Sequence, residues 1–246
     1  MNIRVAHLYP DLLNIYADRG NIAVLAARAA ARGHSLDVTA VSIGDGLDPR
    51  AYDLYYLGGG QDREQQVVAP DLARHAAALR SAHADGAVFL AVCGGYQLLG
   101  RGYRDSQGNE LPGAGVLPLE TVAGERRLIG DVLLRCGWAH DLTLAGFENH
   151  AGRTILDAGA EPLGSVISGF GNDGESDAEG CRFGRAYGTY LHGPLLPRNP
   201  WFADRLLAES LEHLSGHVVE LEPLDDTLER AAHEVAAARA RQRGGR

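Results

Sequence analysis

Hydrophobic residues in the first hundred positions switch repeatedly between strand-like runs and helix-like spacing. Short, mostly apolar runs predict strands over residues 3–8, 36–41, 52–57 and 87–92. Apolar residues at helical spacing predict helices over residues 21–32 and 71–84, and a further helix that begins at Gly94. Strands and helices that alternate in this order predict an α/β fold, with a mostly parallel sheet and helices on both of its faces.

The second half of the chain is richer in strand-like segments. Candidate strands cover residues 127–136, 144–147 and 186–191, and a helix is predicted over residues 199–214. Residues 226–229 (DTLE) resemble a capping box and open another helix, which runs to about Gln242. Because that helix has few large apolar residues, we expect it to pack on the domain or on a partner. The expected organisation is a domain over residues 1–214 and a C-terminal segment over residues 215–246.

Composition and charge exclude several classes of protein. Hydrophobic residues make up 45% of the 246 positions and charged residues 22%, as in an ordinary soluble globular protein. The net charge of -9 argues against non-specific binding to nucleic acid or to anionic lipid. No uninterrupted apolar stretch is long enough for a membrane span, and the first residues lack the pattern of a cleaved signal. We therefore expect a cytoplasmic protein.

The chain contains no lysine, because all 23 basic residues are arginine. A phosphate-binding loop of the G-x-x-x-x-G-K-[ST] kind is therefore excluded, and so is a lysine Schiff base. If the reaction consumes ATP, the ATP site belongs to another chain. No two of the cysteines (Cys93, Cys136 and Cys181) are spaced as a C-x-x-C motif, and the ten histidines show no H-E-x-x-H spacing. We expect neither a disulfide framework nor a metal site.

Cys93 lies where the apolar strand over residues 87–92 passes into a helix through Gly94 and Gly95. In a parallel sheet, such a turn exposes a side chain at the carboxyl end of the strand, beside a helix N-terminus. A helix N-terminus stabilises a thiolate, and Gly94 permits a strained turn that brings its N–H close to the reaction centre. The competing interpretation is a buried, unreactive cysteine at the end of a core strand.

Two further features favour a nucleophile. The triplet Gly58-Gly59-Gly60 follows the preceding predicted strand, so its N–H groups would lie on the same sheet edge and form an oxyanion hole with Gly94. His192 ends another strand-like run and would be the base for the thiol. Taken singly, a glycine triplet is an ordinary turn and a lone histidine is more often structural.

These residues resemble a known family. Residues 91–97 (AVCGGYQ) are similar to the nucleophile elbow of class I glutamine amidotransferases, G-x-C-x-G-x-Q, and residues 58–60 match the oxyanion glycines of that family. Residues 187–193 (YGTYLHG) resemble the histidine motif of its cobyric-acid-synthase-like branch. More narrowly, the chain resembles the GatD subunits of bacterial lipid II isoglutaminyl synthases in residues 8–16 (LYPDLLNIY), 18–21 (DRGN), 127–130 (RLIG) and 146–150 (GFENH). The match runs to about Leu214.

The resemblance implies a flavodoxin-like fold and hydrolysis of L-glutamine to glutamate and ammonia. Cys93 would attack the side-chain amide, and His192 would be the acid and base. Amides of Gly59, Gly60 and Gly94 would hold the oxyanion. Arg127 would bind the α-carboxylate of glutamine with its planar fork, and Gln97 would also contact the substrate. For Arg127 the competing interpretation is a surface charge beside Arg126 and Glu125.

The resemblance also implies a partner, a MurT-like Mur ligase subunit. That chain would use ATP and Mg²⁺ to activate the α-carboxyl group of D-glutamate in the lipid II stem peptide, and ammonia would convert it to D-isoglutamine. No cofactor is expected on the present chain. Three alternatives stay open: a glutaminase for another amidoligase of the cobyric-acid type, a stand-alone cysteine hydrolase or peptidase on a related fold, and a non-catalytic module. Glutaminase against peptidase activity, and reaction with a thiol-reactive glutamine analogue, would separate them.

One feature of the commoner class I pattern is missing. In that pattern a glutamate two residues beyond the histidine orients the ring, whereas here Gly193, Pro194 and Leu195 follow His192. A histidine base without an orienting acceptor loses control of its tautomer. The hypothesis is that the ligase partner supplies the acidic group, so that the isolated chain is a weak glutaminase. Glu148 is the competing candidate within the chain.

Overall fold

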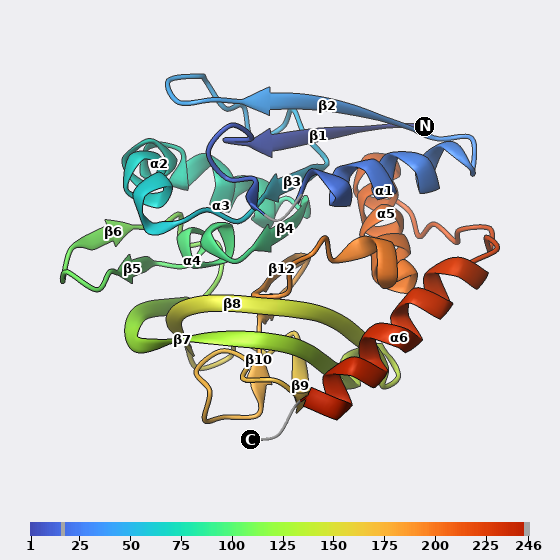
Figure 1. Ribbon diagram of the computed structural model, residues 1–246. Coiled ribbons are helices and arrows are strands. Elements are labelled where there is room, and N and C mark those ends of the chain that lie inside the picture. Colours follow the sequence, from blue (N-terminus) through green and yellow to red (C-terminus); the bar gives the residue numbers. More distant parts are fainter. Residues whose placement is uncertain (16–17, 244–246) are drawn as a thin grey trace.

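The computed structural model describes residues 1–15 and 18–243 (Figure 1). Tyr16 of the predicted N-terminal motif and the last three residues of the predicted C-terminal segment lie outside the described residues. The described chain contains a central, mostly parallel sheet and a second, mostly antiparallel sheet that lies below it in Figure 1.

The central sheet confirms the predicted α/β architecture. Its strand order is β11-β12-β4-β3-β1-β2, and every neighbouring pair except β11 with β12 is parallel. Every residue of β3, β4 and β12 is buried, as expected for strands that are covered on both faces. The strands are β1 (Asn2–Leu8), β2 (Ser35–Val41), β3 (Leu54–Leu57), β4 (Val88–Val92), β11 (Cys181–Phe183) and β12 (Ala186–Thr189).

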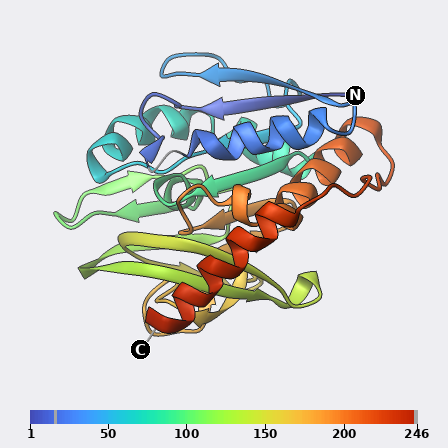
Figure 2. The ribbon, with the colours of Figure 1, turned by 45° about the vertical axis from the view of Figure 1, so that its right-hand side comes forward.

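Helices cover both faces of this sheet. The connections β1 to β2 and β3 to β4 step in opposite directions across the sheet, so right-handed crossovers place their helices on opposite faces. The first crossover carries α1 (Arg19–Ala30), which packs beside α5 (Pro200–Ser215) (Figures 1 and 2). The second carries α2 (Asp62–Arg74) and α3 (Ala76–Ala84), and α4 (Gly94–Leu99) follows β4.

The helix predicted over residues 71–84 needs correction. The structure has two helices there, which meet at His75, and the first of them begins nine residues earlier than predicted, at Asp62. Acidic residues in the first turn, Asp62 and Glu64, suit a helix N-terminus. Pro70 lies inside α2 rather than before a helix start. The N-terminus of α2 therefore comes directly after the glycine triplet.

The second sheet is dominated by a long hairpin of β7 (Leu119–Cys136) and β8 (Leu142–Leu156). The strands predicted over residues 127–136 and 144–147 lie within these two, which are longer than predicted. Its order is β10-β9-β7-β5-β6, with β8 paired to β7. The other members are β5 (Gly102–Arg104), β6 (Glu110–Pro112), β9 (Gly164–Ser168) and β10 (Ala178–Glu179), and short 3₁₀ turns cover Gly137–Ala139 (η2) and Leu196–Arg198 (η3).

The two sheets meet at the histidine that the sequence singled out. The backbone N–H of His192, just after β12, donates to the carbonyl of Phe147 in β8 at 2.7 Å. This backbone bond lies where the 146–150 motif of the second sheet meets the carboxyl edge of the central sheet. The candidate site is thus built from both sheets.

The last helix, α6 (Thr227–Arg243), lies across the second sheet (Figure 2). Ala237 and Ala240 pack against Leu133 of β7 and Ala145 of β8, and Ser168 donates to the Ala240 carbonyl at 2.6 Å. Small alanine side chains permit this close approach, which explains why the helix needs few large apolar residues. No helix in the described part of the chain has the length and apolar character that crossing a bilayer requires.

Candidate active site

Cys93 forms a strained elbow between β4 and α4. Its backbone has φ 49° and ψ -107°, a conformation that non-glycine residues rarely adopt, and its N–H donates to the Thr189 carbonyl of β12 at 2.8 Å. Strain of this kind is concentrated at functional sites. The side chain is 5% exposed and lines a cavity of about 600 Å³ at the carboxyl edge of the sheet. Gly60, Gln97 and Arg127 line the same cavity.

The glycine triplet packs directly against this elbow. A Cβ atom on Gly94 would lie 2.7 Å from the Gly60 carbonyl oxygen and 2.8 Å from the Gly60 nitrogen. The N–H of Gly95 donates to the Gly58 carbonyl at 3.1 Å. Any side chain at Gly94 would push the two turns apart, so glycine is required for the amides of Gly60 and Gly94 to lie near Cys93. Among the described residues, neither amide donates to another protein atom.

Gly59 is placed differently from the sequence-based expectation. Its N–H donates to Oδ2 of Asp18 at 2.6 Å, and both groups are buried. A Cβ atom on Gly59 would lie 2.8 Å from Cε1 of His192. This corrects the prediction that the Gly59 amide binds the oxyanion, because Asp18 already occupies that donor. Gly59 instead gives His192 the room to lie against the triplet.

His192 is fully buried between Cys93 and Asp18. Its Nδ1 lies 3.8 Å from Oδ1 of Asp18, and neither side chain is exposed to solvent. Burial alone would lower the pKa of His192, but the charge of the Cys93 thiolate and the neighbouring Asp18 carboxylate raise that pKa to about 10. The arrangement therefore favours the protonated form of His192 beside the Cys93 side chain, and a histidine in this position can activate a cysteine nucleophile.

Asp18 is a candidate site residue to which the sequence analysis assigned no role. The DRGN motif at residues 18–21 contained the signal, because a short acidic motif after the first strand of a parallel sheet lies on the edge where the cysteine lies. The competing candidate, Glu148, is bound elsewhere: the amides of Phe170 and Gly171 donate to its carboxylate at 2.6 and 3.0 Å, and His150 faces it at 3.4 Å. Asp18 is therefore the candidate within the chain for the orienting acid, and it stands beside the partner-supplied acid that the sequence predicts.

The remaining cysteines have no such setting. Cys136 ends β7 and Cys181 begins β11, and both are fully buried. Burial raises the pKa of each thiol to about 12, so both are protonated at neutral pH. Neither lines the cavity that contains Cys93.

Arg127 lies in β7 and lines the Cys93 cavity with its guanidinium held in place. Nε donates to Oδ1 of Asn149 at 2.8 Å, and Nη2 donates to the Asn149 carbonyl at 2.9 Å. These bonds use the edge of the guanidinium that carries Nε and Nη2, and they leave the edge formed by Nη1 and Nη2 for a carboxylate. A fixed guanidinium of this kind suits two-point binding of a carboxylate.

Gln97 is almost completely buried one turn into α4, and its amide nitrogen donates to the Tyr190 hydroxyl at 3.2 Å. Tyr190 stacks face to face on His150, with ring centroids 3.5 Å apart. Behind them, Glu179 of β10 accepts hydrogen bonds from the Tyr190 amide and the Thr189 hydroxyl at 2.7 and 3.0 Å. Burial raises the pKa of Glu179 to about 8 despite these bonds. The network fixes the segment that leads into His192.

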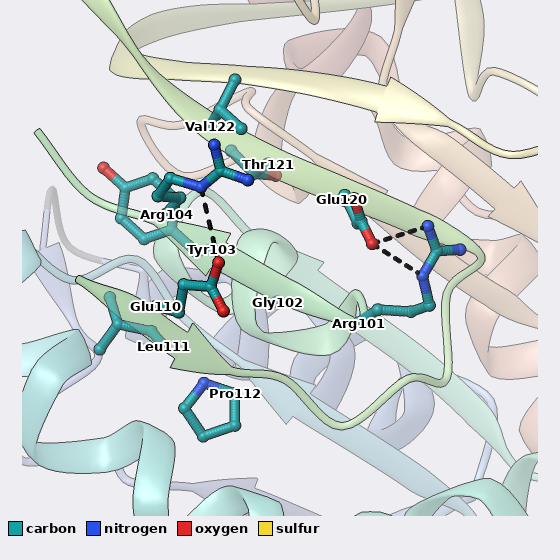
Figure 3. A pocket seen from close by; sticks show the side chains of 10 residues that line it. All are labelled: Arg101, Gly102, Tyr103, Arg104, Glu110, Leu111, Pro112, Glu120, Thr121 and Val122. Atoms are coloured by element: carbon teal, nitrogen blue, oxygen red, sulfur yellow. Dashed lines mark hydrogen bonds and ion pairs between the residues drawn. The ribbon is translucent and has the colours of Figure 1, made fainter. Parts of the chain in front are cut away.

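A second groove of about 350 Å³ lies over β5, β6 and β7 (Figure 3). Figure 3 shows Arg104 directed at Glu110 and Arg101 directed at Glu120, with ion-pair distances of 3.8 and 3.0 Å. Its lining contains neither a cysteine nor a histidine. The groove therefore lacks the cysteine and histidine pair of the Cys93 cavity, and the Cys93 cavity is the candidate active site.

A strained cysteine elbow, a buried histidine near a carboxylate, and two amides that bind no acceptor among the described residues are the parts of a thiol-dependent hydrolase site on an α/β sheet. Comparison with known proteins specifies the class. Residues 4–200 match the family described as the CobB/CobQ-like glutamine amidotransferase domain. The chain belongs to this family, and its enzyme class is that of the glutamine-hydrolysing amidotransferases.

Two relatives match nearly the whole chain. The lipid II isoglutaminyl synthase subunit GatD of Streptococcus pneumoniae is 39% identical over 92% of this chain and 87% of its own length. The corresponding subunit of Staphylococcus aureus is 38% identical over 97% of this chain and 96% of its own length. The cobyric acid synthase of Pelotomaculum thermopropionicum is 36% identical, but over 61% of this chain and 31% of its own length.

Solved structures agree on the fold. The structure of PurLQS from Thermotoga maritima matches with a TM-score of 0.61 and 16% identity over 87% of this chain and 100% of that one. A glutamine amidotransferase from the same organism matches with a TM-score of 0.54 and 16% identity over 96% of this chain and 94% of that one. These matches confirm the expected amidotransferase fold.

Proposed function

We propose that this chain is the glutaminase subunit of a lipid II isoglutaminyl synthase. The observation that carries the proposal is the identity of 38–39% with two GatD subunits over at least 92% of the chain. Cobyric acid synthases match a smaller part of the chain and under a third of their own length. The absence of lysine from the printed sequence excludes a lysine-containing phosphate-binding loop in it and so supports a division of labour in which another subunit binds ATP.

In the first half of the proposed reaction, the Cys93 thiolate attacks the side-chain amide carbon of glutamine. The carbonyl electron pair moves to oxygen, and the amides of Gly60 and Gly94 donate to the resulting oxyanion. The His192 imidazolium gives its proton to the departing nitrogen as the C–N bond breaks. The products of this half-reaction are ammonia and a thioester between Cys93 and the glutamyl group.

In the second half, the neutral His192 ring removes a proton from water as the water oxygen attacks the thioester carbon. Collapse of this tetrahedral intermediate breaks the C–S bond and releases glutamate. The thiolate and the imidazolium are then restored. Asp18 would keep the ring in the orientation that both halves require, and it would stabilise the imidazolium that is present before the first half and restored after the second.

Arg127 would bind the α-carboxylate of glutamine, and its replacement tests this. Arg127→Ala should raise the KM for glutamine roughly 10- to 150-fold, the usual loss for a charge-assisted hydrogen bond. Arg126→Ala is the matched control, since the Arg126 side chain lies over the Phe170 ring and not in the cavity. Initial rates of glutamate release at varied glutamine measure both. Equal, small effects would reduce Arg127 to a surface charge.

The ammonia would pass to a MurT-like ligase subunit that binds ATP and Mg²⁺. That subunit would amidate the α-carboxyl group of D-glutamate in the stem peptide of lipid II, in the cytoplasm. Three free, buried cysteines in the described chain suit a reducing compartment.

Co-purification followed by reconstitution tests the function. The tagged chain should retain a Mur-type ligase from its native host, and the complex with glutamine, ATP and lipid II should yield amidated lipid II by mass spectrometry. The complex with Cys93→Ala should lose amidation from glutamine but keep it with added ammonium salt, because the ligase needs only ammonia. A complex that amidates a corrinoid carboxylate and leaves lipid II unchanged would overturn the assignment in favour of the cobyric-acid alternative.

A further inference from the structure

Free glutamine offers two charged groups beside the amide that reacts. One is the α-carboxylate, for which Arg127 is suited, and the other is the α-ammonium. A buried or half-buried ammonium group needs an anionic or carbonyl partner, because desolvation without one is costly. The cavity that contains Cys93 must therefore provide an anionic or carbonyl acceptor for the ammonium group if it selects free amino acids.

Asp62 is the one carboxylate among the described residues that line this cavity. It stands two residues after the glycine triplet and is the first residue of α2, so the same turn that places Gly60 beside Cys93 also places Asp62. A carboxylate in the first turn of a helix is electrostatically favourable. The cationic lining comes from Arg63 and Arg127, so the wall carries both signs of charge, as an amino acid zwitterion requires.

The Asp62 side chain belongs to an exposed residue and accepts one hydrogen bond from a buried side chain of the cavity wall. The hydroxyl of Tyr103 donates to Oδ1 of Asp62 at 3.3 Å, and Tyr103 is itself 2% exposed and lines the same cavity. A buried phenol is a rigid donor, so it fixes the position of one carboxylate oxygen. Among the described residues, no protein donor binds the second oxygen, Oδ2. The carboxylate is thus oriented on one side and open to a ligand on the other.

We propose that Asp62 binds the α-ammonium group of glutamine and, with Arg127, makes the site specific for the free amino acid. Binding of the ammonium to Asp62 and of the carboxylate to Arg127 fixes the α-carbon at two points, which leaves the side-chain amide to reach Cys93. A glutamine whose α-amino group is acylated, as in a peptide, loses the positive charge that Asp62 recognises. The arrangement thereby separates free glutamine from glutaminyl groups in peptides.

The proposal rests on glutamine being the substrate, and the test uses glutaramate, which is glutamine without its α-amino group. Wild-type chain should hydrolyse glutamine with a kcat/KM that exceeds its kcat/KM for glutaramate roughly 10- to 150-fold. Asp62→Asn should lower kcat/KM for glutamine by that factor, through KM, and leave kcat/KM for glutaramate unchanged. The ratio between the two substrates should therefore collapse.

Glu64→Gln is the matched control, because Glu64 lies on the same helix, two residues away, and does not line the cavity. It should keep the wild-type ratio. Tyr103→Phe should lower the ratio partially, because the carboxylate remains but loses its orienting hydroxyl. Calorimetric binding of glutamine and glutaramate to Cys93→Ala, with and without Asp62→Asn, gives the same comparison without turnover.

The outcomes separate the two hypotheses. A wild-type chain, alone and in its complex, that hydrolyses neither substrate would contradict the proposed function itself. A wild-type chain that hydrolyses glutamine, together with an Asp62→Asn variant that keeps the wild-type ratio, would overturn the role of Asp62 alone. A change in kcat for both substrates without a change in their ratio would also overturn it, because it would show that Asp62 supports the structure of the elbow rather than the ammonium group.

Discussion

Replacing Cys93 with alanine should abolish glutamine hydrolysis, with a loss on the order of 10⁴-fold or more in kcat. The Cys93 sulfur forms the thioester bond with the glutamyl group, and no other side chain that lines the cavity carries a thiol. Initial rates of glutamate release from the purified complex measure the effect. A thiol-reactive glutamine analogue should label the wild-type chain at Cys93 and should not label the variant.

Cys136→Ala and Cys181→Ala are the controls for this experiment. Both thiols are buried and protonated at neutral pH, because burial raises the pKa of each to about 12. Their removal creates small cavities in the core, so some loss of thermal stability is expected while turnover is retained. Loss of most activity in either control, with the folded state intact, would contradict the assignment of Cys93 as the nucleophile.

Asp18→Asn should lower kcat by about 10²–10⁴-fold, the usual contribution of a positioned acid–base pair. The change preserves the size of the side chain but removes the negative charge 3.8 Å from Nδ1 of His192. The side-chain amide of asparagine can also donate a hydrogen bond to Nδ1 of His192, which would favour the His192 tautomer with its proton on Nε2. Steady-state kinetics with saturating glutamine measure the loss.

The pH dependence gives a readout that a purely structural defect would not produce. The pKa of His192 is raised to about 10, with Cys93 and Asp18 opposing the effect of burial. The alkaline limb of kcat/KM should therefore lie near that value in the wild type. Without the Asp18 carboxylate the pKa of His192 falls, so the alkaline limb should move to lower pH in Asp18→Asn.

The same variant decides between an internal and a partner-supplied acid. If Asp18 orients His192, the isolated chain is competent and Asp18→Asn is impaired with or without the ligase subunit. If Asp18→Asn keeps full activity in the complex while alanine replacement of acidic residues at the ligase interface removes it, the partner completes the site instead.

Several parts of this protein follow from the sequence by itself, because they depend on neighbouring residues. The apolar run before Cys93 and the two glycines after it define a strand, a strained turn and a helix in that order. The Gly58-Gly59-Gly60 turn follows another buried strand in the same way. Parallel strands have their carboxyl ends at one edge, so local patterns were sufficient to bring Cys93, the triplet and His192 together.

Only the tertiary structure decided which groups lie beside His192 and which groups bind Glu148. Asp18 lies 174 positions before His192, and no periodicity or spacing links them, yet packing of the loop after β1 against the glycine triplet brings the carboxylate to the ring. That contact also occupied the Gly59 amide, which the sequence had assigned to the oxyanion. Glu148 was excluded for the same kind of reason, because Phe170 and Gly171 bind its carboxylate.

Packing also decided the lengths and positions of elements in the second half. The strands of the β7–β8 hairpin extend well past their apolar segments, because each strand stabilises its partner through cross-strand hydrogen bonds. The alanine-rich α6 has too little apolar surface to indicate what it covers, and only the shape of the second sheet gives it a place. Local sequence determines which backbone conformations and nucleophiles are available. Pairs of charged groups and contacts between distant segments form only when the whole chain is packed.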